Sequence, residues 1–172
     1  MILSPIQVSG ILLQVQGNGV NVDVNPAFGL VGGAISAFLT TLLVGAILVA
    51  LAPKYTEKMM DRVRAEPIGS AIYGILLLVL LLLVMLILVI TIIGILFAIP
   101  LGIVVFVAWA IGAAIAYLAI AERLVGLEDG WLKPLLVGAA INGGLALTGI
   151  GGIISFCIGA AGFGAVLRNW LS

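Results

Sequence analysis

The sequence predicts an all-α polytopic membrane protein, and three observations support this fold class. Of its 172 residues, 64% are hydrophobic and only 8% are charged, whereas about 25% of the residues in a soluble domain are charged. The charges gather in short stretches that separate long uncharged runs. Several runs reach about 20 residues, the length at which an apolar helix crosses a bilayer. We therefore expect about five hydrophobic segments, which include one long hairpin and one short C-terminal hairpin.

The N-terminal residues have a different pattern and are expected to lie outside the bilayer. Apolar and polar residues alternate on both sides of a Gly-Asn-Gly stretch at 17–19, which is typical of a β-hairpin. The alternative is a polar tail, because an isolated hairpin is only marginally stable in water. The predicted organisation is an extracytoplasmic β-hairpin or tail over residues 1–27, followed by a helical transmembrane domain over residues 28–172.

The first apolar run, residues 28–52, predicts a membrane-spanning helix. Gly29 and Gly33 lie about one helical turn apart in this run and form a GxxxG motif. Small residues at this spacing allow a second helix to approach closely. Both glycines are therefore candidate interface residues, either in a homo-oligomer or in a contact with another membrane protein.

Residues 54–66 predict a short amphipathic helix between two prolines. Basic and acidic residues recur in it at spacings of three and four, which places opposite charges side by side on a helix. Its apolar residues form one stripe: Tyr55, Met59, Met60 and Val63. We expect this helix to lie at the membrane surface, and the alternative is a solvated connector. The candidate contacts to a partner are Tyr55, Lys58, Met59 and Arg62.

The uncharged run over residues 68–121 is too long for one span. As a single helix it would be about 80 Å long, more than twice the thickness of the hydrocarbon core, so it must fold back as a hairpin. The turn is predicted within residues 91–102. There Thr91 can cap a helix, Gly94 permits an unusual backbone angle, and Pro100 suits the first turn of a new helix. We expect helices over about 68–91 and 96–121.

The last uncharged run, residues 135–167, is too long for one span and short for two. The stretch TGIGG at 148–152 divides it into pieces of about 13 and 15 residues, which can span only if other helices surround them. We predict a short pair of helices here. Both hairpins begin with a proline after a charged residue and turn at a Thr-Gly element, which suggests a parallel internal repeat.

The distribution of positive charge predicts the orientation. Four of the seven cationic residues lie between residues 54 and 64, so this stretch is expected in the cytoplasm by the positive-inside rule. Two hairpins then place every other Lys and Arg on the same side. We predict a multi-pass protein of the plasma membrane, embedded in the lipid bilayer, with its N-terminus outside and its C-terminus in the cytoplasm.

Several kinds of chemistry lack the residues that they need. The chain has no histidine and a single cysteine, Cys157, so Ser–His catalysis and metal sites built on His or Cys clusters are excluded. None of the seven acidic residues falls in an uncharged run, whereas proton-coupled transporters keep such a group at mid-depth. We expect no enzyme activity, catalytic residue, cofactor or metal. The zero net charge also argues against nucleic acid as a partner.

The order of prolines and glycines suggests a family. It runs from Pro-Lys and a charged helix through TIIG and IPLG to TGIGG and GFGA. Over residues 53–166 this order resembles the polytopic membrane domain found with bactofilin-like, polymer-forming cytoskeletal proteins of bacteria and archaea. The resemblance implies a membrane-embedded scaffold or anchor without a known active site. The soluble β-helix that forms filaments in that family is absent from this chain.

Two functions are consistent with these observations. The first is a non-enzymatic membrane scaffold or anchor that self-associates or binds a membrane or cytoskeletal partner. The alternative is a small channel or uncoupled transporter lined by the breaks at 91–102 and 148–152. Polar residues near these breaks are its candidate cavity-lining groups: Thr91, Asn142 and Thr148. Broken helices expose backbone groups that can line a cavity, although Asn142 is also well suited to an interhelical hydrogen bond.

Overall fold

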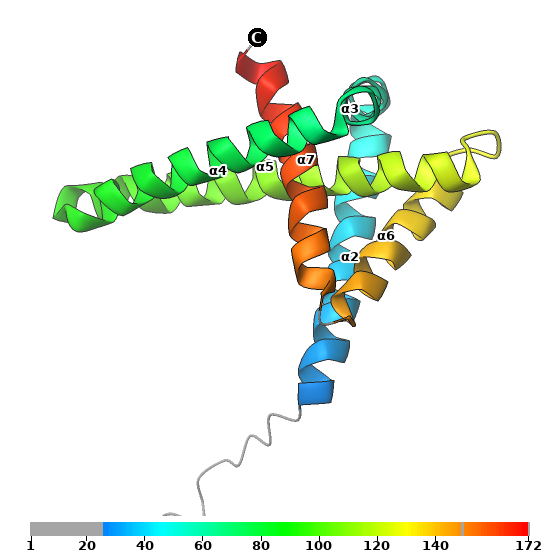
Figure 1. Cartoon of the computed structure of the whole chain (residues 1–172), viewed down its shortest axis with the longest axis horizontal. Helices are drawn as coiled ribbons and strands as arrows, with labels where there is room; N and C mark the ends of the chain where they lie inside the picture. Colours follow the sequence, from blue (N-terminus) through cyan, green and yellow to red (C-terminus); the bar gives the residue numbers. More distant parts are fainter. Residues whose placement is uncertain (1–25, 149, 172) are drawn as a thin grey trace, which may run out of the picture.

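Helices make up most of the chain that the computed structural model describes, which is residues 26–148 and 150–171 (Figure 1). Within this part no strand is found, and the all-α polytopic class is confirmed. The N-terminal hairpin or tail predicted for residues 1–27 lies outside it, apart from two residues that begin the first helix. The helices are α2 (Pro26–Leu51), α3 (Pro53–Ala65), α4 (Pro67–Ile90), α5 (Ile92–Val125), α6 (Leu132–Ala146) and α7 (Gly151–Leu171).

Four of these helices are long and apolar enough to cross a membrane, namely α2, α4, α5 and α7, and α6 is a shorter apolar helix. Together they are the five predicted hydrophobic segments. Large aliphatic and aromatic side chains cover the outside of α4 and α5, among them Leu83, Leu96 and Phe106. Since water does not favour such a surface, it is suited to lipid. The protein is a multi-pass membrane protein.

Prolines and one glycine set several helix boundaries. Pro53 and Pro67 stand at the first positions of α3 and α4, where the missing N–H of proline costs nothing. At its other end, α5 stops at Gly126, whose φ of 69° is in the left-handed region that favours glycine. The predicted amphipathic helix over 54–66 is therefore confirmed as α3, shifted by one residue.

A single residue, Thr91, separates α4 from α5 and caps the second helix as predicted. Its hydroxyl donates a hydrogen bond to the Leu88 carbonyl at 3.0 Å and accepts one from the Gly94 N–H at 3.1 Å. The expected unusual backbone angle at Gly94 is wrong, because this glycine lies inside the helix without a positive φ. Glycine is needed there for space, since a Cβ atom would lie 2.0 Å from the Leu88 carbonyl oxygen.

The expectation that Pro100 begins a helix is also wrong. The Thr91 cap starts α5 at Ile92, so Pro100 lies inside the helix rather than in its first turn. Without an N–H, Pro100 cannot bond the carbonyl four residues earlier. Membrane helices tolerate such a proline because neighbouring groups satisfy the freed carbonyl.

The turn between α6 and α7 repeats the contacts of the first turn. The Thr148 hydroxyl donates to the Leu145 carbonyl at 2.9 Å, as Thr91 does to Leu88. A Cβ atom on Gly151 would lie 1.5 Å from the same Leu145 carbonyl oxygen. Both turns thus follow the pattern Leu-x-x-Thr-x-x-Gly, and this local similarity supports the predicted repeat of the two hairpins.

Helix α7 is longer than the predicted piece of about 15 residues and occupies the centre of the fold. It continues through Arg168 to Leu171, and half of its most apolar stretch is buried, against 6% for α4. Figure 1 shows α4 and α5 side by side, running across α7 rather than along it. The expectation that the last pair must be surrounded by other helices is confirmed for α7.

Four glycines make this crossing possible, and we call them the crossing glycines: Gly74, Gly112, Gly162 and Gly164. A Cβ atom on Gly74 would lie 1.9 Å from the Ala160 carbonyl oxygen, and one on Gly162 would lie 1.8 Å from the Gly112 carbonyl oxygen. Real Cβ atoms do not approach backbone this closely. The helices therefore meet backbone to backbone, as small residues allow in membrane proteins.

Helix α6 packs against α2 through a polar contact and a glycine. The Asn142 side-chain amide donates to the Thr41 hydroxyl at 2.7 Å and to the Ala37 carbonyl at 3.3 Å. The neighbouring Gly143 faces the Ala34 carbonyl oxygen, which would lie 3.0 Å from an added Cβ atom. This contact joins the C-terminal hairpin to the first span.

Candidate functional site

Most of the charges of the described chain gather at one end of the fold, which we call the charged end. It consists of α3, the start of α4 at Glu66, the end of α5 and the end of α7. Glu122 of α5 forms an ion pair with Arg64 of α3, and Glu66 pairs with Arg168 of α7 at 2.9 Å. These pairs show that the end of α5 and the end of α7 both return to the region of α3.

The apolar stripe of α3 is buried within the protein itself. Met59, Met60 and Val63 belong to a core cluster formed mainly with residues of α5 and α7, including Ile115, Leu118 and Val166. The buried Thr56 hydroxyl donates to the Ala52 carbonyl at 3.0 Å. Because its apolar side is covered in this way, α3 is fixed to the ends of the spanning helices and does not rest on lipid through this stripe.

The predicted partner contacts of α3 therefore differ in their exposure. Lys58 is exposed, whereas Tyr55 and Arg62 are partly buried. Met59 is fully buried and is not available to a partner, because its side chain fills the core beneath α3. Burial raises the pKa of Tyr55, while the neighbouring Trp170 and Arg62 act in the opposite direction. The exposed outer surface of α3 is thus polar and carries both signs of charge: Lys54, Glu57, Lys58 and Asp61.

The glycines predicted as an interface in α2 have no neighbour in the described chain. A Cβ atom added to Gly29, Gly32 or Gly33 would meet nothing within 4 Å. We call these three the open glycines. These glycines are exposed along the N-terminal half of α2. The crossing glycines, in contrast, are in contact with the backbone of another helix.

The three candidate cavity-lining residues do not come together. Thr91 lies at the tip of the α4–α5 hairpin, and Thr148 lies at the separate turn between α6 and α7 (Figure 1). Each hydroxyl donates to a carbonyl of its own turn. Asn142 is partly buried between α6 and α2, where it bonds Thr41. These polar groups are thus used in local turns and in helix packing.

Sequence reasoning missed two features of the structure. It did not identify which glycines form the crossing at α7, although the run from Gly159 to Gly164 is rich in Gly and Ala. It also missed a cavity at the charged end that Glu66, Ser70 and Arg168 help to line. Glu66 and Ser70 lie four positions apart, but Arg168 is 102 positions from Glu66, and no spacing pattern links it to the other two. Only the crossing of α7 over α4 brings them together.

The comparison with known families identifies the chain. A model for a domain of unknown function, DUF8173, matches residues 8–172. Since this match covers nearly the whole chain, the protein belongs to that family. No curated protein and no solved structure matches the chain. The family description names no activity, so the resemblance to the membrane domain found with bactofilin-like proteins stays a prediction.

Proposed function

We propose that the protein is a non-enzymatic membrane scaffold that self-associates through α2 and presents α3 to a partner. The observation that carries this proposal is the open glycine face of α2. The crossing glycines bring helix backbones together, whereas Gly29, Gly32 and Gly33 meet no other helix in the described chain. Gly144 and Gly152 are open as well, but Gly29 and Gly33 lie on one side of a spanning helix at the spacing of a GxxxG motif. A second copy of the chain is the occupant that we propose for this face.

The physical reason is the close approach that small residues allow. In lipid, helices associate through van der Waals packing and interhelical hydrogen bonds rather than through the hydrophobic effect. An α2 helix from a second copy could pack along the spacing of Gly29 and Gly33. Ser36 and Thr40 continue the same side of the helix and are also exposed, so their hydroxyls could add hydrogen bonds between the copies.

The outer surface of α3 is the proposed contact to a partner outside the bilayer. The core beneath it holds the helix rigidly, which reduces the ordering that binding would require. Its exposed cations and acids nearly balance, and a helix recruited by anionic lipid alone would carry a larger excess of cations. A protein partner or a cytoskeletal element with alternating charge fits this surface better.

The orientation belongs to the same proposal. Every Lys and Arg of the chain lies in or near the charged end: Lys54, Lys58, Arg62, Arg64, Arg123, Lys133 and Arg168. By the positive-inside rule this end lies in the cytoplasm of a plasma-membrane protein. The C-terminus is then cytoplasmic, and α2 begins on the outside. A partner of α3 would accordingly be cytoplasmic.

The channel alternative has less support from the geometry. A pore lined by both helix breaks requires the breaks to meet, whereas the α4–α5 turn at Thr91 and the α6–α7 turn at Thr148 lie in separate places (Figure 1). Their hydroxyls also bond their own turns. We therefore place the scaffold first.

The self-association proposal can be tested with Gly33→Leu in the full chain. A bulky side chain would prevent the close approach of a second helix, whereas a Cβ atom at this position meets nothing within 4 Å in the described chain. We expect native mass measurements in mild detergent to show oligomers for the wild type and folded monomers for the variant, with a lower unfolding temperature only to the extent that the oligomer stabilised the fold. A wild type that is monomeric, or a variant that keeps its oligomers, would contradict the proposal.

The contact of α3 is tested separately with Lys58→Glu, which leaves the buried stripe intact. Chemical crosslinking in native membranes should lose a specific product in this variant, because the reversed charge opposes the pairing with the partner. Lys133→Glu, an exposed change in the first turn of α6, is the matched control. Equal crosslinking patterns for the wild type and Lys58→Glu would remove α3 from the proposal and leave α2 unaffected.

A further inference from the structure

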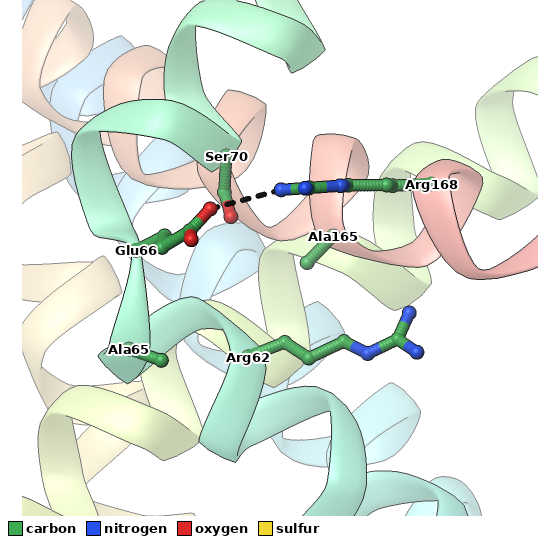
Figure 2. Close-up of a pocket in the computed structure, with 6 residues that line it drawn as sticks. All are labelled: Arg62, Ala65, Glu66, Ser70, Ala165 and Arg168. Atoms are coloured by element: carbon green, nitrogen blue, oxygen red, sulfur yellow. Dashed lines mark hydrogen bonds and ion pairs between the residues drawn. The ribbon is translucent and has the colours of Figure 1, made fainter. Parts of the chain in front are cut away.

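A cavity opens at the charged end where α3, α4 and α7 meet. Its volume is about 380 Å³, and its lining residues are Arg62, Ala65, Glu66, Ser70, Ala165 and Arg168. This volume is within the range of small-molecule sites. Figure 2 shows the two arginines on either side of Ala165, with Ser70 beside the Glu66–Arg168 pair. Two consecutive helices, α3 and α4, and the distant α7 thus contribute polar groups to one space.

The cavity carries a net positive charge. Arg168 is held by Glu66, with 2.9 Å between a guanidinium nitrogen and a carboxylate oxygen. Arg62 forms no ion pair within the described residues, so its guanidinium is available to a ligand. The two arginines exceed the single carboxylate by one charge. Arginine presents a planar fork of N–H donors that matches the oxygens of a phosphate group.

Ser70 adds a neutral polar group to the same site. Its residue is 3% exposed and lies in the first turn of α4, close to Glu66 in Figure 2. A serine hydroxyl can donate a hydrogen bond to a phosphate oxygen. The N-terminus of α4 also lacks a side-chain cap, and the uncapped N–H groups of a helix start favour an anion.

The cavity lies where two helices that are long and apolar enough to cross a membrane end, which is where we expect lipid headgroups. Glu66 directly precedes the span α4, and Arg168 lies near the end of the span α7. About two helical turns of α7 from Arg168, Ala161 lines an apolar groove with Ile68 and Ile72 of α4. A basic pocket between spans at this depth has the chemistry that recognises an anionic headgroup.

We propose that this cavity binds a phosphate group, carried either by the headgroup of an anionic lipid or by a free phosphate. Arg62 and Arg168 contact the phosphate oxygens, and Ser70 donates a hydrogen bond to them. Glu66 competes with the ligand for Arg168 and so weakens binding. The site does not depend on self-association, because all its groups come from one chain.

The test counts bound phosphatidylglycerol on the full chain by native mass spectrometry in mild detergent. Arg62→Gln should weaken binding about tenfold, because it removes a charge-assisted contact. Lys54→Gln combined with Lys133→Gln removes two exposed cations of the same end outside the cavity and should leave binding unchanged. An Arg62→Gln variant with undiminished binding, or a control that loses as much as Arg62→Gln, would overturn the proposal.

A variant with the opposite sign makes the test stricter. Glu66→Gln frees Arg168 and removes a repelling carboxylate, so it should strengthen binding severalfold. A purely structural role of the Glu66–Arg168 pair predicts no gain of binding. Unchanged or weaker binding in Glu66→Gln, with an unfolding temperature equal to that of the wild type, would contradict the assigned role of the cavity.

Competition identifies the source of the phosphate. Phosphatidylglycerol that stays bound in a large excess of inorganic phosphate assigns a lipid headgroup. If inorganic phosphate displaces phosphatidylglycerol from the wild type but not from Arg62→Gln, the natural ligand is a free phosphate anion. Failure of both probes to bind the wild type would exclude the site.

Discussion

Two sets of glycines lie in opposite environments. The crossing glycines of α4, α5 and α7 are packed against backbone, whereas the open glycines of α2 have no neighbour in the described chain. At the crossing, an added Cβ atom on Gly162 would lie 1.8 Å from a backbone oxygen of α5. On α2, an added Cβ atom on Gly33 would meet nothing within 4 Å. Small residues in a membrane helix therefore do not say by themselves whether the approaching helix belongs to the same chain.

This difference separates stability from assembly. The crossing glycines hold α4, α5 and α7 together, so changes there act on folding. The open glycines contribute little to the packing of one chain, so changes there should act on association. Matched substitutions at the two sets can therefore test the comparison directly.

The largest effect is expected for Gly162→Ala. The new methyl group would overlap the Gly112 carbonyl, and both atoms belong to rigid parts of packed helices. Overpacking of this kind costs about 1 to 3 kcal/mol, and sometimes more. Thermal unfolding in detergent should show a marked drop or a failure to accumulate folded protein. A wild-type unfolding temperature would mean that α7 does not cross α5 as closely as described.

A smaller but clear effect is expected for Gly151→Ala at the α6–α7 turn. The methyl group would meet the Leu145 carbonyl oxygen at 1.5 Å, and the turn must open by a backbone shift that costs about 1 kcal/mol. Gly102→Ala is the matched control, since its nearest neighbour is the flexible end of Met85 at 2.9 Å. Equal unfolding temperatures for the two variants would argue against a sterically tight turn.

A third effect concerns the bond between Asn142 and Thr41. Interhelical hydrogen bonds in membranes contribute about 0.6 kcal/mol, so Asn142→Ala should lower stability slightly through the lost bond and the lost packing. A double-mutant cycle with Thr41→Val isolates the bond from the packing. A coupling energy near zero would show that the two side chains do not interact.

The smallest effect is expected for Gly33→Ala. The methyl group enters open space, so the unfolding free energy of the monomer should change by less than about 0.5 kcal/mol. A glycine-to-alanine substitution is expected to disrupt the fold at Gly162 but to leave the stability nearly unchanged at Gly33. A large loss of stability would place Gly33 in contact with another part of its own chain.

Much of the fold could be predicted from local sequence. The uncharged runs and their prolines predicted the spans and α3, because length and hydrophobicity alone decide whether a helix can cross a bilayer. The Thr91 cap was also predictable, since its donor and acceptor lie within the same turn. The start of α5 was misplaced because Pro100 suggested a new helix, whereas the cap had already begun one.

The functional features were harder to predict because they depend on tertiary contacts. The apolar stripe of α3 reads the same in sequence whether lipid, a partner or its own core covers it, and here the core covers Met59. The cavity between Arg62 and Arg168 joins residues more than 100 positions apart. The periodicity of α3 predicts its stripe, but no periodicity in the sequence indicates what covers the stripe or where the cavity forms.

The most direct test of the account is disulfide crosslinking of Gly33→Cys in native membranes, in a chain with Cys157→Ala. A disulfide requires Cα atoms about 4.4 to 6.8 Å apart, so it reports the close approach that the open glycines would allow. Leu80→Cys, on the lipid-facing surface of α4, is the control for random collisions. The account predicts a covalent dimer from Gly33→Cys and little or none from Leu80→Cys. Equal yields from both, or no dimer from Gly33→Cys, would contradict self-association through α2.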